Sequence, residues 1–190
     1  EDIVGLVLLS AKDHYCHFNA AETGFIETVC SIASIAMKNA VLYEKMYREA
    51  RIDPLTGAYN YRYFTEQLDE QFHAHGRECL TLLYLDVDDF KLYNQLYGAG
   101  EGDDALRRIS DTISCCVGEQ GTVFRTSGKV FAVLLPLQDS QRARTLAHEI
   151  GRQVSRINQA PERARLKELT VSAGICSAPY AAASAKELMD

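Results

Sequence analysis

Residues 80–94 read LTLLYLDVDDFKLYN, and this stretch decides the fold class. Leu80 to Val87 form a nearly continuous apolar run with the length of a buried strand. Asp86 and Asp88 stand at its carboxyl end, which is where open α/β sheets bind their ligands. Two residues apart, they share one face of an extended backbone and suit a hard cation such as Mg²⁺, although a solvated acidic turn has the same pattern. The stretch therefore predicts a strand with a binding site at its carboxyl end.

The segments on either side of this strand alternate between helical and extended patterns. Apolar residues at helical spacing predict helices, and short apolar runs bounded by turn residues predict strands. Residues 126–129 join two of the strands as a hairpin with Gly128 in its turn. Helices are expected at residues 61–72, 103–116 and 143–157, and further strands at residues 122–125, 130–135 and 169–177. The order α-β-α-β-β-α-β predicts an α/β (α+β) fold, a mixed sheet with packed helices and a β-hairpin.

The N-terminal part of the chain has a different organisation. Residues 3–9 read as a strand, and a long helical pattern follows from Glu22. Small and apolar residues recur in it at alternating spacings of three and four, as in the seam of a two-chain coiled coil. The predicted dimerisation seam consists of Val29, Ala33, Ala36, Ala40, Tyr43 and Tyr47. An amphipathic helix packed on its own domain is the alternative.

A domain boundary is expected near Arg51. Pro54 disfavours helical geometry at Asp53, and Gly57 permits a turn. The chain then divides into residues 1–50 and 51–190. Because one strand and one helix cannot enclose a core, we expect residues before Glu1 to complete the first domain.

Composition excludes several classes of protein. The net charge of −6 and the pI near 5.4 argue against binding to a nucleic-acid polymer, which needs Lys and Arg to neutralise phosphates. The longest apolar run, residues 3–9, is far shorter than the about 18 residues that a membrane span needs, so no span is expected. The six cysteines include no CxxC pair, which predicts reduced thiols and a cytoplasmic location.

Several motifs resemble those of one family in order and spacing. They are DPLTG at residues 53–57 with Asn60 and Arg62, DVDDFKLYN at 86–94, GAGEGD at 98–103 and LTVSAG at 169–174. From residue 51 to its end the chain resembles the GGDEF family of diguanylate cyclases. Residues 1–50 resemble the final strand and helix of a GAF-type sensor domain that runs into a signalling helix.

The resemblance implies a nucleotide site. It places GTP against Asp86, Phe90, Lys91, Asn94 and Asp103. Asn94 and Asp103 would recognise the guanine edge, since a carboxylate accepts from N1-H and N2-H₂ while an amide both donates and accepts. Asp86 would be a metal ligand for Mg²⁺, which in the family assists the joining of two GTP molecules into cyclic di-GMP.

The signature hairpin departs from the family pattern. Residues 127–131 read SGKVF, so that Lys129 stands where the family has an acidic metal ligand and Val130 where it has a catalytic Glu. Exchanging a carboxylate for an ammonium changes the local charge by two units, and we therefore expect no ordinary cyclase activity. Lys129 would instead contact the phosphates of GTP; the alternative is a solvent-facing Lys129 and an empty pocket.

Two other family features are missing. Gly118 and Gly121 stand where members with product inhibition carry Arg and Asp, so no inhibitory cyclic di-GMP site is expected. The family's late helix, A-D-x-A-L-Y-x-A-K, is not reached by residue 190.

These observations predict a degenerate GGDEF domain that binds GTP or mediates homodimerisation and regulates a neighbouring domain or partner, such as a downstream phosphodiesterase. One alternative is a residual diguanylate cyclase in which Asp88, Asp89 or Glu101 replaces the lost carboxylate. Another is a purely structural dimerisation domain.

Overall fold

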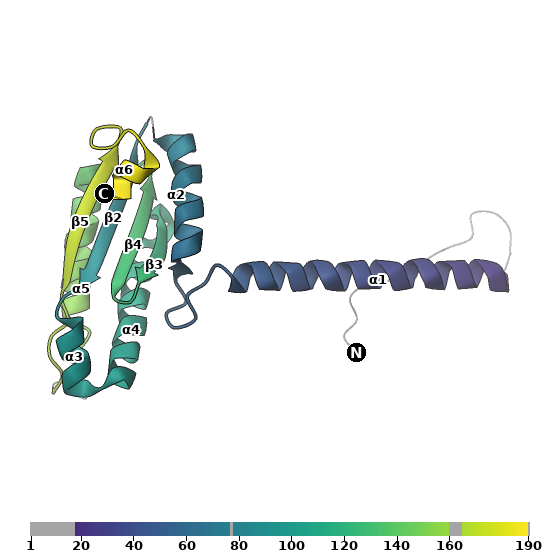
Figure 1. Cartoon of the computed structure of the whole chain (residues 1–190), viewed down its shortest axis with the longest axis horizontal. Helices are drawn as coiled ribbons and strands as arrows, with labels where there is room; N and C mark the ends of the chain where they lie inside the picture. Colours follow the sequence, from purple (N-terminus) through teal and green to yellow (C-terminus); the bar gives the residue numbers. More distant parts are fainter. Residues whose placement is uncertain (1–17, 77, 160–164, 190) are drawn as a thin grey trace. The chain divides into compact units, whose positions relative to one another are not determined.

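The computed structural model describes residues 18–76, 78–159 and 165–189 (Figure 1). The chain divides into two compact units, Glu1–Ala50 and Arg51–Asp190. The strand predicted at residues 3–9 lies outside the described residues.

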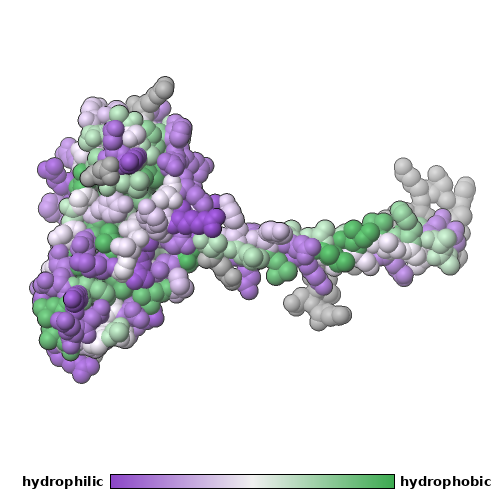
Figure 2. Space-filling view, viewed as in Figure 1, coloured by the Kyte–Doolittle hydropathy of each residue, from purple (hydrophilic) through white to green (hydrophobic). Residues whose placement is uncertain are grey.

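The described residues of the first unit form the long helix α1 (Ala20–Glu49). It begins with a capping box, in which the Asn19 amide carbonyl accepts from the Glu22 backbone N–H and the Glu22 carboxylate accepts from that of Asn19, each at 2.9 Å. The six residues of the predicted dimerisation seam all lie on α1 and are exposed. Hydrophobic residues also lie along other parts of the α1 surface in Figure 2.

The apolar character of α1 bears on the expectation that the chain has no membrane span. Among the described residues, Ala20–Tyr47 is long and apolar enough by length and composition to cross a membrane, with a mean hydropathy of 1.4 over its best window. Core helices of soluble proteins and signal sequences meet the same criterion. The expectation of no span therefore stays a prediction.

The second unit is built on a five-stranded mixed sheet. Its strands lie in the order β1 (Tyr59–Asn60), β3 (Thr122–Ser127), β4 (Val130–Pro136), β2 (Leu80–Val87) and β5 (Val171–Ala178). β1 runs parallel to β3, and the other neighbours are antiparallel. The mixed sheet with a β3–β4 hairpin confirms the predicted fold class.

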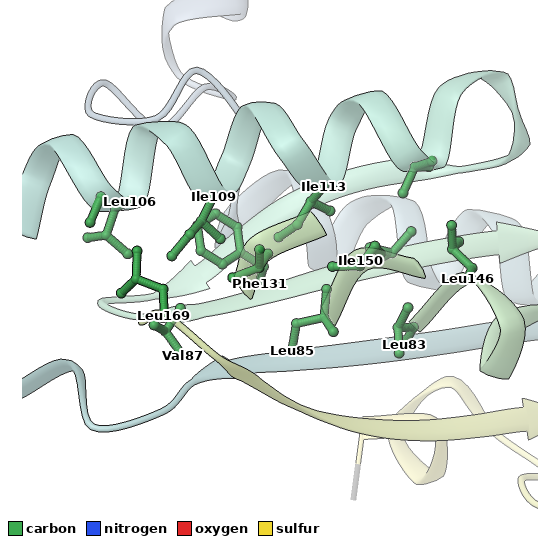
Figure 3. Packing of buried hydrophobic residues seen from close by; sticks show 14 of the residues in the cluster. Leu83, Leu85, Val87, Leu106, Ile109, Ile113, Phe131, Leu146, Ile150 and Leu169 are labelled. Carbon is green, nitrogen blue, oxygen red and sulfur yellow. The ribbon is translucent and has the colours of Figure 1, made fainter. Parts of the chain in front are cut away.

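Helices cover both faces of the sheet (Figure 1). On one face α4 (Ala99–Val117) and α5 (Ser140–Ser155) pack on sheet residues such as Leu85 and Phe131, through Ile109 and Ile150 among others (Figure 3). On the other face α2 (Tyr61–His75) and α6 (Ala185–Met189) pack on alternate residues of the same strands. Because β2 is buried from both sides, its sequence is a nearly continuous apolar run.

The structure differs from the sequence prediction beyond β2. A separate helix, α3 (Phe90–Tyr97), follows β2, and the next helix begins at Ala99 instead of Asp103. Glycines disfavour helix interiors, so Gly100 and Gly102 give no local sign of the helix that contains them. β1, a short 3₁₀ turn at Gly118–Gln120 and α6 were also not predicted, because elements of two to five residues carry no periodicity.

Candidate functional site

The carboxyl end of β2 lies directly beside the β3–β4 hairpin. Asp86 is opposite Val130 of β4, so the preceding residue, Lys129, projects from the turn toward it. Lys129 Nζ lies 2.9 Å from Asp86 Oδ1 and donates a hydrogen bond of 3.2 Å to the Val87 carbonyl oxygen. The contact with Asp86 is an ion pair rather than a hydrogen bond, and the buried Asp86 Oδ1 has no hydrogen-bond donor. An ammonium group thus lies between two oxygen atoms.

A divalent cation at this position would take the same two oxygen atoms as ligands. Whether these atoms are available therefore tests whether Mg²⁺ fits the site. The positively charged Nζ of Lys129 already contacts both the Asp86 and the Val87 oxygen. Among the residues that the structure describes, no group of three or more His, Cys, Asp or Glu side chains is placed to hold a metal ion. The donor set present does not fit a divalent cation.

The other carboxylates near this edge are already engaged. Asp88 accepts hydrogen bonds of 2.7 Å from the hydroxyls of Thr170 and Ser172 on the β5 side. Asp89 forms a 2.7 Å ion pair with Lys167, and the hydrogen bond and positive charge of that lysine lower the pKa of Asp89. Glu101 forms a 2.7 Å ion pair with Arg108 of its own helix. None of the three lies in a shared cluster that could take over the role of a lost metal ligand.

A pocket of about 500 Å³ opens between α3, α4 and the hairpin. It brings together five of the six residues predicted to bind nucleotide, and Asp86, which lies behind Lys129, is not part of the lining. The lining residues are Asp89, Phe90, Lys91, Asn94, Asp103, Leu106, Arg125, Gly128 and Lys129. The sequence motifs thus converge on one concave surface.

The side of the pocket that holds Asn94 depends on the approach of α3 to α4. Asp89 has a left-handed backbone, with φ of 49°, and Gly98 has φ of 85°, so the chain turns sharply at both ends of α3. A Cβ on Gly102 would lie 1.7 Å from Asn94 Oδ1, so only glycine permits this approach. Asn94 Oδ1 is buried without a hydrogen-bond partner within the protein. Asn94 lines the pocket, and an unsatisfied amide oxygen beside a pocket is suited to a ligand N–H donor.

Arg125 is a pocket residue that the sequence prediction did not include. Its Nη1 donates to Asp53 Oδ1 at 2.8 Å, and its Nη2 donates to the Gly128 carbonyl oxygen at 2.6 Å. Arg125 therefore ties the DPLTG loop to the turn that carries Lys129. Burial opposes ionisation of Asp53, but hydrogen bonds from Thr56 and Arg125 outweigh it and lower the pKa of Asp53. The sequence did contain a signal for Arg125, because an Arg two residues before the signature is part of the family pattern.

Known proteins share the sequence pattern of this chain. The family model "Diguanylate cyclase, GGDEF domain" matches residues 50–190, which is most of the chain. The chain belongs to the GGDEF family. The resemblance of its motifs is thereby confirmed, and the second unit is a GGDEF domain of cyclic di-GMP signalling.

Relatives agree with this assignment. Diguanylate cyclase A of Treponema denticola is 28% identical over 99% of this chain and 51% of its own length. Diguanylate cyclase DgcM of Escherichia coli is 34% identical over 70% of this chain and 32% of its own length. The chain thus spans about half or less of the length of these two relatives.

The fold of the GGDEF domain also has a solved counterpart. The crystal structure of the coiled coil and GGDEF domain of DgcB from Caulobacter crescentus, in complex with c-di-GMP, superimposes with a TM-score of 0.75. The alignment covers 90% of this chain and 89% of that one at 23% identity, and this likeness concerns the fold. The GAF-type interpretation of residues 1–50 stays a prediction.

Proposed function

We propose that this GGDEF domain is a regulatory module that binds GTP without a divalent cation and does not cyclise it. The observation that carries the proposal is the position of Lys129, whose ammonium lies 2.9 Å from Asp86 Oδ1 and 3.2 Å from the Val87 carbonyl oxygen. A positive charge at this point neutralises phosphate charge in the way that a bound cation otherwise would.

The geometry of Lys129 supports a direct phosphate contact. Its side chain is 42% exposed and borders the pocket, so the ammonium can meet a ligand. An ammonium has three N–H donors, and the hydrogen bond to Val87 leaves two for a phosphate oxygen. Lys91 adds a second positive charge to the same pocket wall. Asn94 Oδ1 and the Asp103 carboxylate would then accept hydrogen bonds from the guanine edge.

We expect no cyclisation, because the site lacks the free carboxylates that the reaction needs. Metal-assisted phosphoryl transfer needs acidic ligands that hold the ion against the reacting phosphate. Lys129 and Val130 supply none, and Asp88, Asp89 and Glu101 are engaged elsewhere. This weighs against a residual cyclase with a substitute carboxylate.

The regulatory output would pass through α1 or through a neighbouring domain. We propose a cytoplasmic homodimer that pairs along α1 and controls an effector such as a phosphodiesterase domain. GTP can shift such a system only if two states bind it with different affinities.

The test is isothermal titration of GTP, GDP and ATP into the chain, with Mg²⁺ and then with EDTA, accompanied by chromatography for cyclic di-GMP. We expect guanine-selective binding that survives EDTA, without product. Lys129→Glu should weaken binding in EDTA by about tenfold or more, because an attractive charge becomes repulsive. Lys186→Glu, an equal charge change on α6, is the matched control.

Three outcomes would contradict the proposal. Formation of cyclic di-GMP would make the domain an enzyme. Equal affinity of the wild-type and Lys129→Glu proteins in EDTA would remove the phosphate contact. Failure to bind any nucleotide would leave a structural dimerisation domain.

A further inference from the structure

Strand β5 forms one edge of the sheet in the second unit (Figure 1). It pairs with β2 on one side, and no strand among the described residues pairs with it on the other. The sequence of β5 contains no charged residue and no proline. Proteins usually protect an edge with charges, Pro or a bulge, because its free N–H and C=O groups can pair with another chain. The open edge of β5 therefore has the character of a binding site for an extended segment.

The hydrogen bonds beside β5 identify which backbone groups point to the open edge. The Thr170 carbonyl oxygen, just before β5, accepts a 3.0 Å hydrogen bond from the Asp88 N–H, so Thr170 faces the β2 side. In an antiparallel strand the N–H and C=O of one residue point to the same side, and successive residues alternate. Since β5 keeps an unbroken register with β2, the N–H and C=O of Val171, Ala173 and Ile175 point away from β2. These groups are available to one further strand.

A groove of about 610 Å³ lies between this edge and α5. The side chains of the same three β5 residues line one side of it. The other side carries Arg144, His148 and Arg152, which follow one another at intervals of four residues on α5 and are all exposed. These three residues are called the basic row below. A segment that pairs with the edge of β5 would present every second side chain to the basic row.

The basic row is a local positive surface on a chain whose net charge is −6. Arg144 and His148 have no ion-pair or hydrogen-bond partner for their side chains within the part of the chain that the structure describes. Arg152 forms an ion pair with Glu149 of the same helix. Both side chains of that pair are well exposed, so it contributes little, and a carboxylate of a ligand can compete for Arg152.

The basic row also decides between a second copy and an acidic partner at this edge. Two copies paired antiparallel along β5 would be related by a twofold axis perpendicular to the sheet, which places both α5 helices on the same face. Their basic rows would then face each other across the two strands and repel. An extended segment with acidic side chains on that face would be attracted instead.

We propose that the open edge of β5 binds an extended acidic segment of a protein partner as a further strand, antiparallel to β5, with its acidic side chains directed at the basic row. In an antiparallel pair, residues that exchange both hydrogen bonds lie opposite each other and project their side chains to the same face. The residues of the segment opposite Val171, Ala173 and Ile175 therefore point toward α5, and these are the acidic positions. The site shares no lining residue with the nucleotide pocket and goes beyond the proposed function.

The experiment measures binding of a fluorescein-labelled peptide to the full chain by fluorescence anisotropy. The peptide has eight residues, as β5 has, and alternates glutamate with valine. One version carries N-methyl groups on its glutamate amides, which face β5 in the proposed complex, and another carries them on its valine amides, which face away. We expect saturable binding of the plain and the valine-methylated peptides. Glutamate methylation should weaken binding by about tenfold or more, because it removes hydrogen-bond donors without changing the charge.

Charge-reversing variants of the protein test the basic row. Arg144→Glu and Arg152→Glu should each weaken binding of the plain peptide by about tenfold or more, because attraction becomes repulsion. Arg142→Glu is the matched control and should bind like the wild type, since Arg142 lies on the same helix outside the groove and donates to Gln120.

Ala173→Pro tests the edge from the side of the protein. Proline is tolerated on an edge strand where its missing N–H faces away from the sheet, and it removes one donor from the open edge. We expect weaker peptide binding with an unchanged circular dichroism spectrum. Should this variant fail to fold, the methylated peptides report on the same hydrogen bonds without altering the protein.

Several results would overturn the proposal. Equal binding of the two methylated peptides would leave charge attraction without strand pairing, and equal affinity of the wild-type and Arg144→Glu proteins would remove the basic row. Failure to bind the plain peptide, or equally tight binding of a lysine–valine peptide or of oligothymidylate, would exclude an acidic protein segment. Self-association of the wild type that Ala173→Pro abolishes would assign the edge to a second copy.

A final arm separates this site from the nucleotide pocket. Saturating GTP should leave the affinity for the peptide unchanged, because the two sites share no lining residue. Displacement of the peptide by GTP would place it in the nucleotide pocket and overturn the β5 site. Since each ligand is titrated separately, failure of one site leaves the result at the other standing.

Discussion

Gly102 illustrates how a single residue shapes the pocket through the side chain that it lacks. A methyl group at this position would lie 1.7 Å from Asn94 Oδ1 and 2.9 Å from Asn94 Cγ. Those atoms belong to a side chain that can rotate away, so the fold can accommodate the change at little cost. In the proposed GTP complex the pocket cannot, because Asn94 would no longer present its amide to the guanine.

Gly102→Ala should therefore weaken GTP binding by about tenfold, the value of roughly one lost hydrogen bond, with little change in thermal stability. Titration and a melting curve measure the two effects. Gly100→Ala is the matched control, since a Cβ there meets nothing within 4 Å. Equal GTP affinity of both variants would show that Asn94 does not contact the nucleotide.

At the scale of elements, Arg125 holds the β3–β4 turn against the loop that precedes α2. Its guanidinium bridges Asp53 and the Gly128 carbonyl oxygen, and its side chain is only 13% exposed. Hydrogen bonds between charged groups in such partly buried positions contribute more than exposed pairs. Loss of this bridge would free the turn that carries Lys129.

Asp53→Asn should lower the free energy of unfolding at pH 7 by about 2 kcal/mol, because it removes a charge-assisted hydrogen bond to Arg125. The pKa of Asp53 is lowered in the folded state, so its stabilisation is complete above the ordinary value of 3.8 and is lost as the pH falls below it. Urea unfolding between pH 7 and pH 3 measures both effects. The variant should lose less stability in acid than the wild type, and Asp111→Asn, on the exposed side of α4, should follow the wild type.

Strands and helices with strong periodicity were predictable from the sequence. The ends of β2 agree with the apolar run, and α5 follows its amphipathic pattern, because burial dictates these residues directly. α3 and the first turn of α4 were missed, since the close contact of Gly102 with Asn94 is tertiary and leaves no local signal. Likewise, the pairing of Lys129 with Asp86 depends on the register of β2 and β4, which spacing alone does not determine.

For the whole molecule, ligand binding and folding are linked. A ligand that binds only the folded state at a concentration of 100 times its Kd stabilises the protein by about 2.7 kcal/mol, which raises the melting temperature by several degrees. We expect GTP to produce this shift in EDTA and ATP at the same concentration to produce much less. Equal shifts would contradict guanine selectivity, and scanning calorimetry of the full chain distinguishes the cases.

The uninterrupted helical geometry of α1 also constrains how its length can change. Each residue of an α-helix turns the chain by about 100°, so one inserted pair of residues would rotate everything beyond it by about 200°. Seven inserted residues turn it by about 700°, only about 20° short of two full rotations. Insertions and deletions in α1 therefore preserve one continuous contact face only when they add or remove close to a whole number of turns, as seven residues do.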